Sequence, residues 1–104
     1  MAELMDWLAA RTPEAPTALR ERIADLVLEH PEWESMPLPE ALIAAGERLM
    51  QDVLAAPPRN RDSAVDLLAA DACVTYAFEA AADEPERIVA LADGAMQRIA
   101  QLAG

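Results

Sequence analysis

The sequence predicts an all-α fold, a small antiparallel bundle of about five helices, three long and two short or medium. Apolar residues recur at three- and four-residue spacings along most of the chain. The eight prolines fall between these stretches and divide the chain into helix-length segments. No alternating β-branched run bounded by turn residues is present, so no strand is predicted. With 104 residues, the chain fits a single helical domain, residues 1–104, with one modest core.

Two shorter helices are expected in the first half of the chain, over residues 2–11 and 17–30. Each has apolar residues at helical spacing. Each also stops at a proline, because proline disfavours helix in the residue that precedes it. The proline-rich residues 31–39 that follow are a connector, which we expect Trp33 and Met36 to pin to the core.

A long third helix is expected to begin near Pro39, since proline suits the first helical turn, and to end at Pro57. Its inner stripe is Leu42, Gly46, Leu49, Met50 and Val53. Glycine inside a helix costs on the order of 1 kcal/mol relative to alanine. A close helix crossing at Gly46 would offset that cost, and simple tolerance of the glycine is the other interpretation.

The fifth helix carries the best start signal in the chain. Asp83 and Glu86 have the spacing of a capping box, and Pro85 lies in the first turn. A regular apolar stripe follows, and its members are Ile88, Leu91, Ala92, Ala95, Ile99 and Leu102. This pattern predicts an amphipathic helix with one face on the core.

The fourth helix, for which Asn60 is a suitable N-cap, is apolar on almost every side. One side is expected to hold Val65, Leu68, Ala72 and Tyr76, with Leu68 on the inner face, and another side Leu67, Val74 and Phe78. A helix that is hydrophobic on two sides is typical of a domain centre or of one wall of a dimer.

Three polar residues interrupt this helix at four-residue steps: Asp71, Thr75 and Glu79, here called the polar row. Four interpretations are open, in decreasing order of preference. The row is a solvent-facing strip, or it pairs with an arginine such as Arg48 or Arg98, because a buried carboxylate must be paired or protonated. It could instead be a polar feature of a subunit interface, or part of a ligand or metal pocket.

Within the row we expect Glu79 to reach water and Asp71 to be buried against an arginine. If the row belongs to a pocket beside the fourth helix, Tyr76 and Phe78 would line that pocket with it.

The charge of the chain argues against two classes of partner. The net charge is −11, from 19 acidic and 8 basic residues. Phosphate-backbone binding needs clusters of Lys and Arg, so nucleic acid is not expected as a partner. The same acidity argues against docking on anionic membranes. The N-terminus lacks the basic start of a signal peptide, so we expect a cytoplasmic location.

Signals for catalysis and metal binding are absent from the sequence. It contains no Gly-rich phosphate loop, no Gly-x-Ser-x-Gly and no His-Glu-x-x-His. Cys73 is the only cysteine and His30 the only histidine, so neither a metal nor a cofactor is expected. Among apolar neighbours, Cys73 is interpreted as a structural residue.

The run LLAADACVTYAFEAAAD, residues 67–83, resembles one helix of the trans-prenyl diphosphate synthases. The resemblance covers this helix alone, in letters that are mostly alanine and leucine. The aspartate-rich metal motifs of that family are missing here, and no activity is carried over.

Taken with the two-sided fourth helix, these absences predict a protein that works through protein–protein contact, as a homodimer or with another protein. The alternative is a small-molecule-binding helical bundle with a pocket beside the fourth helix, its ligand unknown. An enzyme is the least favoured version of that alternative.

Overall fold

The computed structural model describes residues 3–11, 14–55, 61–82 and 84–103. Within these ranges the chain forms five α-helices and one short 3₁₀ helix, and it contains no strand. The elements are α1 (Glu3–Ala10), α2 (Thr17–Glu29), the 3₁₀ helix η1 (Pro31–Ser35), α3 (Leu38–Ala55), α4 (Arg61–Ala80) and α5 (Pro85–Ala103). The predicted all-α fold is confirmed, with α3, α4 and α5 as the three long helices.

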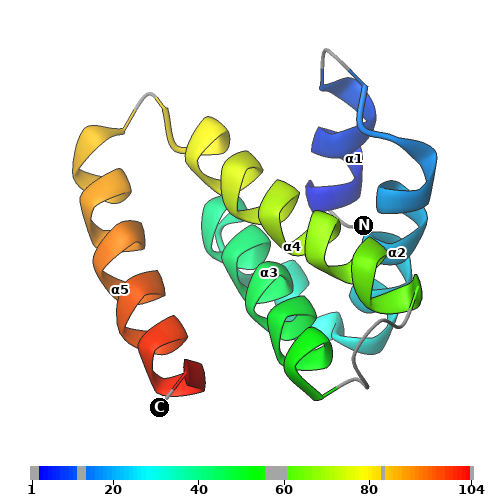
Figure 1. Ribbon diagram of the computed structural model, residues 1–104. Coiled ribbons are helices and arrows are strands. Elements are labelled where there is room, and N and C mark those ends of the chain that lie inside the picture. The colour runs from blue at the N-terminus through cyan, green and yellow to red at the C-terminus, as the bar shows by residue number, and fades with distance from the viewer. Residues whose placement is uncertain (1–2, 12–13, 56–60, 83, 104) are drawn as a thin grey trace.

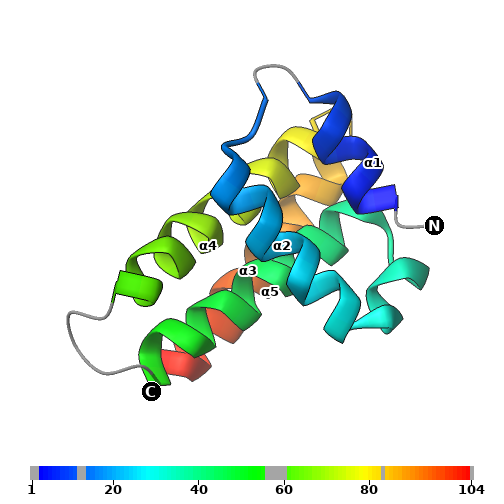
Figure 2. The same cartoon turned by 90° about the vertical axis from the view of Figure 1, so that its right-hand side faces the viewer.

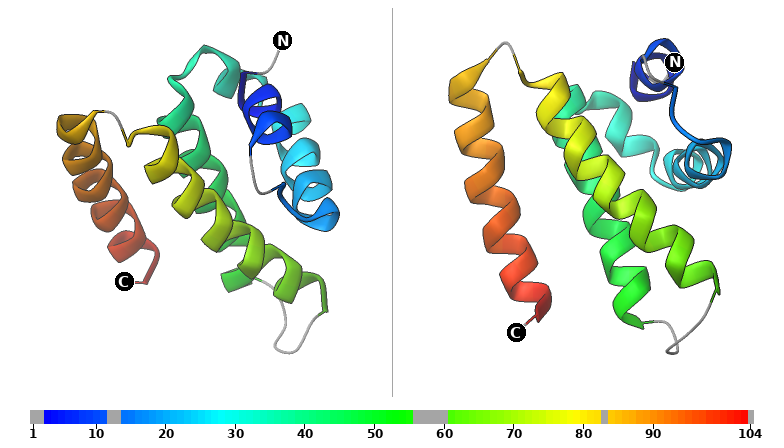
Figure 3. Two further views of the ribbon diagram at one scale, coloured as in Figure 1. Left: turned by 90° about the horizontal axis from the view of Figure 1, so that it is seen from above. Right: turned by 45° about the horizontal axis from the view of Figure 1, so that its top comes forward.

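The helices form three layers, as the two views of Figure 3 show. The α3–α4 pair is the central layer, with α1, α2 and η1 on one face and α5 alone on the other. Along the chain, α3, α4 and α5 run in alternating directions (Figure 1). Figure 2 shows the covered side, where α2 lies across the central pair. The two faces of the central layer are therefore covered unequally.

The connector between α2 and α3 is anchored as the sequence predicts. Helix α2 ends at His30, whose backbone N–H donates to the Val27 carbonyl oxygen at 3.2 Å. The next residues wind into η1, where Trp33 is buried in the core and Met36 is partly buried against it. The predicted start signals at Asn60 and Asp83 lie outside the described residues.

The α3–α4 contact is the most extensive in the fold, and Gly46 lies within it. A Cβ atom at this position would lie 3.3 Å from the Val74 Cγ2 atom and 3.4 Å from the Ala70 backbone oxygen. The close crossing expected at Gly46 is confirmed. Removal of water from both helices can offset the intrinsic helical cost of glycine.

The buried face of α4 differs from the one expected. Leu68, assigned to the inner face, is 63% exposed, and Leu67 is 50% exposed. Five residues of α4 are buried in the core: Ala69, Ala70, Cys73, Tyr76 and Ala77. All of them except Tyr76 have small side chains. The expectation for Leu68 was wrong because the two helix axes approach too closely for leucine at the crossing, and small side chains fill that contact instead.

None of the helices in the described ranges has both the length and the apolar character needed to span a membrane.

Candidate functional site

The polar row does not act as one unit. Successive residues in an α-helix are about 100° apart, so each four-residue step turns by about 40° around the axis. From Asp71 to Glu79 the row therefore turns by about 80°. Asp71 lies on the side of α4 that faces α3 and α5, whereas Glu79 reaches α1.

Glu79 is held by Arg11, a residue that the sequence analysis did not select. The guanidinium Nε and Nη2 atoms each donate to a Glu79 carboxylate oxygen at 2.7 Å. The same guanidinium lies 4.3 Å from the centre of the Tyr76 ring, which also contacts Trp7. This pair lowers the pKa of Glu79 below its ordinary value, through the hydrogen bond with Arg11 and despite partial burial. The cluster ties α1 to the end of α4, and Tyr76 is a core residue in it.

Asp71 and Thr75 are both exposed, so the expectation that Asp71 is buried against an arginine was wrong. The Thr75 hydroxyl donates to the Asp71 backbone oxygen at 3.1 Å, so the Thr75 hydroxyl is bonded to its own helix. The described residues show no ion pair for the Asp71 carboxylate.

The two arginines suggested as partners of the polar row pair elsewhere. Arg48 contacts Asp52 on its own helix, with 3.2 Å between Nη2 and Oδ1. Arg98 pairs with Glu47, which links α5 to α3. Both arginines therefore pair with a carboxylate of α3 and not with the polar row of α4.

A groove opens between the three long helices, on the side of the central layer away from α1 and α2. We call it the α3–α4–α5 groove; its volume is about 190 Å³. It is lined by Ile43, Gly46, Glu47 and Met50 of α3, Leu67, Ala70, Asp71 and Val74 of α4, and Ala95 and Ile99 of α5. It is a pocket beside the fourth helix, but Tyr76 and Phe78, which we expected to line such a pocket, are not part of its wall.

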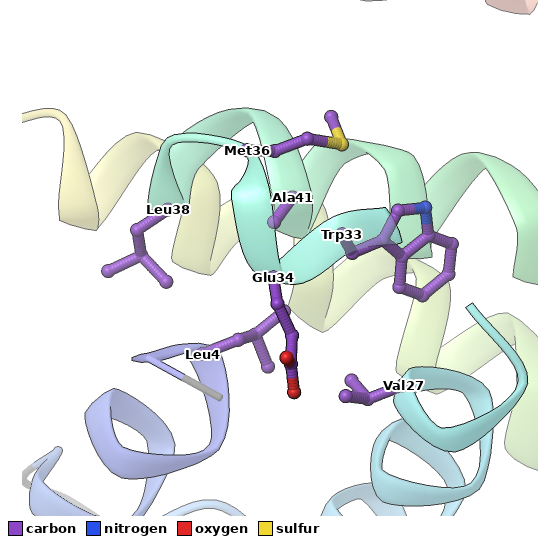
Figure 4. Close-up of a pocket in the computed structure, with 7 residues that line it drawn as sticks. All are labelled: Leu4, Val27, Trp33, Glu34, Met36, Leu38 and Ala41. Atoms are coloured by element: carbon purple, nitrogen blue, oxygen red, sulfur yellow. The ribbon is translucent and has the colours of Figure 1, made fainter. Parts of the chain in front are cut away.

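A second hollow lies between α1, α2, η1 and α3, and Figure 4 shows the seven side chains around it. Its volume is about 10 Å³, which is no more than one water molecule needs. The Glu34 carboxylate lies between Leu4 and Val27 at its edge (Figure 4). We interpret it as a packing gap in the core and not as a ligand site.

A charged cluster joins the covered face to the central layer. Arg22 of α2 donates from Nε to an Asp66 oxygen at 2.7 Å and from Nη2 to an Asp52 oxygen at 3.0 Å. All three side chains are partly buried. The hydrogen bond with Asp66 raises the pKa of Arg22. Asp52 also pairs with Arg48, so each carboxylate of the cluster has an arginine partner, and the cluster holds α2 against α3 and α4.

The single thiol and the acidic residues give no catalytic or metal centre in the part of the chain that is described. Burial raises the pKa of the Cys73 thiol to about 12, so at neutral pH it is protonated and a poor nucleophile. No group of three or more His, Cys, Asp or Glu side chains is arranged to hold a metal ion among the described residues.

The outward side of α5 is apolar and uncovered. Val89 is 62% exposed, Met96 70% and Ile99 39%, and Ala92 lies between them. We call these four residues the outer seam of α5. Among the side chains of this helix that the structure describes, Leu91 and Ala95 are buried, against the central layer. Two ion pairs add to that contact: Arg87 with Glu40, and Arg98 with Glu47, both on α3.

Compared with protein-family models, with curated proteins and with solved structures, the chain matches none of them. Its function is therefore inferred from the geometry of its own residues.

Proposed function

We propose that the protein is a cytoplasmic protein–protein interaction module that forms a homodimer through the outer seam of α5. The observation that carries the proposal is a long helix with apolar residues on two sides. One side packs on α3, and the other faces solvent. Exposed single hydrophobic residues are common, but a regular exposed row on one helix is typical of an interface.

The spacing of the outer seam suits helix–helix packing. Val89, Ala92, Met96 and Ile99 are separated by steps of three, four and three residues. This is the a and d pattern of a heptad repeat, which forms a narrow seam against a second helix. A partner helix laid on the seam would cover Val89 and Met96, which are largely exposed in the single chain.

The local charge favours a second copy of the same chain as the partner. The chain as a whole carries −11, so two copies repel each other at long range. Helix α5 itself carries two acidic residues, Glu86 and Asp93, and its two arginines pair with Glu40 and Glu47 of α3. From Gly94 to Ala103 the only charged residue is Arg98. The seam is therefore where two such acidic molecules can approach with little repulsion.

The unequal coverage of the two faces of the central layer also supports a homodimer. One face of the α3–α4 pair lies under α1, α2 and η1, and the other under α5 alone (Figure 3). A second copy packed on α5 would add the missing layer. Burial of each large side chain would contribute about 1.5–3 kcal/mol before the entropic cost of association.

Sedimentation equilibrium of the purified chain at micromolar concentration tests the proposal. We expect a dimer for the wild type and a monomer for Met96→Glu, because a charge in the seam cannot be buried without a partner. Gln97→Glu is the matched control. It adds the same charge at the neighbouring exposed position, outside the seam, and should remain dimeric.

Circular dichroism of both variants should match the wild type, since positions 96 and 97 are exposed in the single chain. A monomeric wild-type protein at 100 μM, or a dimer that survives Met96→Glu, would show that the seam is not a dimer interface.

A further inference from the structure

We propose that the α3–α4–α5 groove is a binding site for a small molecule with an apolar body and a protonated amine, with the Asp71 carboxylate as the counter-ion. This inference does not depend on the dimer. It rests on a different wall of the molecule, and Ile99 is the single residue that belongs to both surfaces.

The size of the groove selects the kind of occupant. Its volume of about 190 Å³ is somewhat larger than the ~150 Å³ apolar cavity that holds a benzene molecule. A docked helix needs a much longer channel, with several anchor positions along it. The groove therefore fits one compact ligand, with a body about the size of a phenyl ring and a short tail.

The walls of the groove favour an apolar body. Eight of its ten lining residues are apolar or glycine, and they come from all three long helices. Ile43, Ala70 and Ala95 are already buried at its floor. Gly46 also lines the floor, at the point where α3 and α4 are in close contact. A ligand body placed there would leave water and contact aliphatic carbon on several sides.

The charged groups of the groove favour a cation at its edge. Two carboxylates line it, and Glu47 is already neutralised by Arg98. Asp71 is exposed and has no ion pair in the described part of the chain. The uncompensated charge of the wall is therefore negative, and the net charge of −11 further concentrates cations around the molecule. An anionic ligand would meet repulsion from both sources.

Three probes with nearly the same body separate these contributions: 2-phenylethylamine, 2-phenylethanol and 3-phenylpropionate. Each is titrated into ¹⁵N-labelled full-length protein at pH 7, and backbone amide shifts are followed. We expect the amine to shift signals of Ile43, Val74 and Ile99. It should bind about three- to tenfold more tightly than the alcohol, since the ion pair with Asp71 is partly exposed to water. The carboxylate should bind most weakly.

Two variants with the same change of charge locate the effect. Asp71→Asn should lower the affinity for the amine to that for the alcohol and leave alcohol binding unchanged. Asp93→Asn is the matched control, an exposed aspartate of α5 that does not line the groove, and it should keep the preference for the amine. Met96→Glu should also keep it, although that variant is expected to lose the dimer.

Three results would overturn the proposal. If no probe at millimolar concentration shifts the backbone amide signals of the groove residues, the groove is not a ligand site. Equal affinities for amine and alcohol in the wild type would remove Asp71 as the counter-ion. Amine-induced shifts confined to other surfaces would show nonspecific attraction to an acidic protein.

Discussion

The two faces of the α3–α4 layer differ in how completely they are covered. On one face, α1, α2 and η1 enclose large side chains such as Leu8, Ile23 and Leu26, all of which are fully buried. On the other face, the described side chains of α5 that are buried are Leu91 and Ala95, Ile88 is partly buried, and two Arg–Glu ion pairs join the helix to α3. The first face is fully packed, whereas the second has a groove and an apolar seam that are in contact with solvent.

The comparison shows that a clear amphipathic pattern does not measure burial. Helix α5 has the most regular apolar stripe in the sequence, yet Ile99 of that stripe is 39% exposed, and the neighbouring apolar side chains of Val89 and Met96 are more exposed still. Helix α4 has a weak pattern, because apolar residues occur on most of its sides, yet its alanines and Cys73 form the centre of the core. Periodicity reports which residues share a side of a helix, and neighbouring helices decide which side is covered.

The largest difference between the two faces should appear when one aliphatic side chain is truncated on each. Leu49→Ala, in the fully buried part of α3, should lower the free energy of unfolding by about 2–5 kcal/mol. Ile99→Ala, at the exposed edge of α5, should cost about 1 kcal/mol. Urea unfolding in the monomeric Met96→Glu background measures both without a contribution from association. Equal losses would mean that α5 is packed as tightly as α3.

The two helical glycines offer a second contrast. Gly46→Leu should destabilise the fold by about 1–3 kcal/mol, because even a Cβ there meets Val74 and the Ala70 backbone. Gly94→Ala should stabilise it by about 0.5–1 kcal/mol through helix propensity. Its added Cβ meets only the flexible Arg98 guanidinium, whose Nη1 atom is 3.1 Å away. Thermal melts of both variants test this, and a stabilising Gly46→Leu would refute the tight crossing.

Two aspartates of α4 point toward opposite faces and should respond differently. Asp66→Asn weakens the pair with Arg22 on the covered face and should cost about 1–2 kcal/mol. Asp71→Asn, on the open face, should change the free energy of unfolding by less than about 0.5 kcal/mol. Chemical denaturation at pH 7 gives both values. A large loss from Asp71→Asn would mean that its carboxylate has a structural partner.

The effect expected at Glu79 is small, and it should depend on pH. Since Arg11 lowers the folded-state pKa of Glu79, the pair stabilises the fold above the unfolded pKa of about 4.3. That contribution is lost as pH falls through the folded-state pKa. The loss caused by Glu79→Gln should therefore be larger at pH 7 than at pH 3, measured by urea unfolding at both values. Glu21→Gln, an exposed carboxylate on α2, is the control, and a loss from Glu79→Gln that is independent of pH would contradict the argument.

The candidate site was only partly predictable. The sequence placed a polar row on α4 and a possible pocket beside it, and Asp71 does line a groove. It could not show that Glu79 turns away to Arg11, because those residues are 68 positions apart in the chain. Nor could it identify the α3 wall of the groove, since Ile43 and Met50 look like ordinary core positions in a helical stripe. Contacts between distant segments depend on how the helices pack, which local spacing does not encode.

By itself, the sequence determined the helices and most of their ends. Proline removes a backbone donor and restricts the residue before it, and apolar spacing of three and four fixes the helical period, so both signals act locally. Only the tertiary structure decided which face of α4 is buried, because that depends on the distance between two helix axes. Gly46 on α3 and the alanines of α4 set this distance together. Because the small side chains of α4 face α3, Leu67 and Leu68 lie at the surface. Among the described helices α5 alone covers the other face of the central layer, so the groove and the outer seam remain exposed.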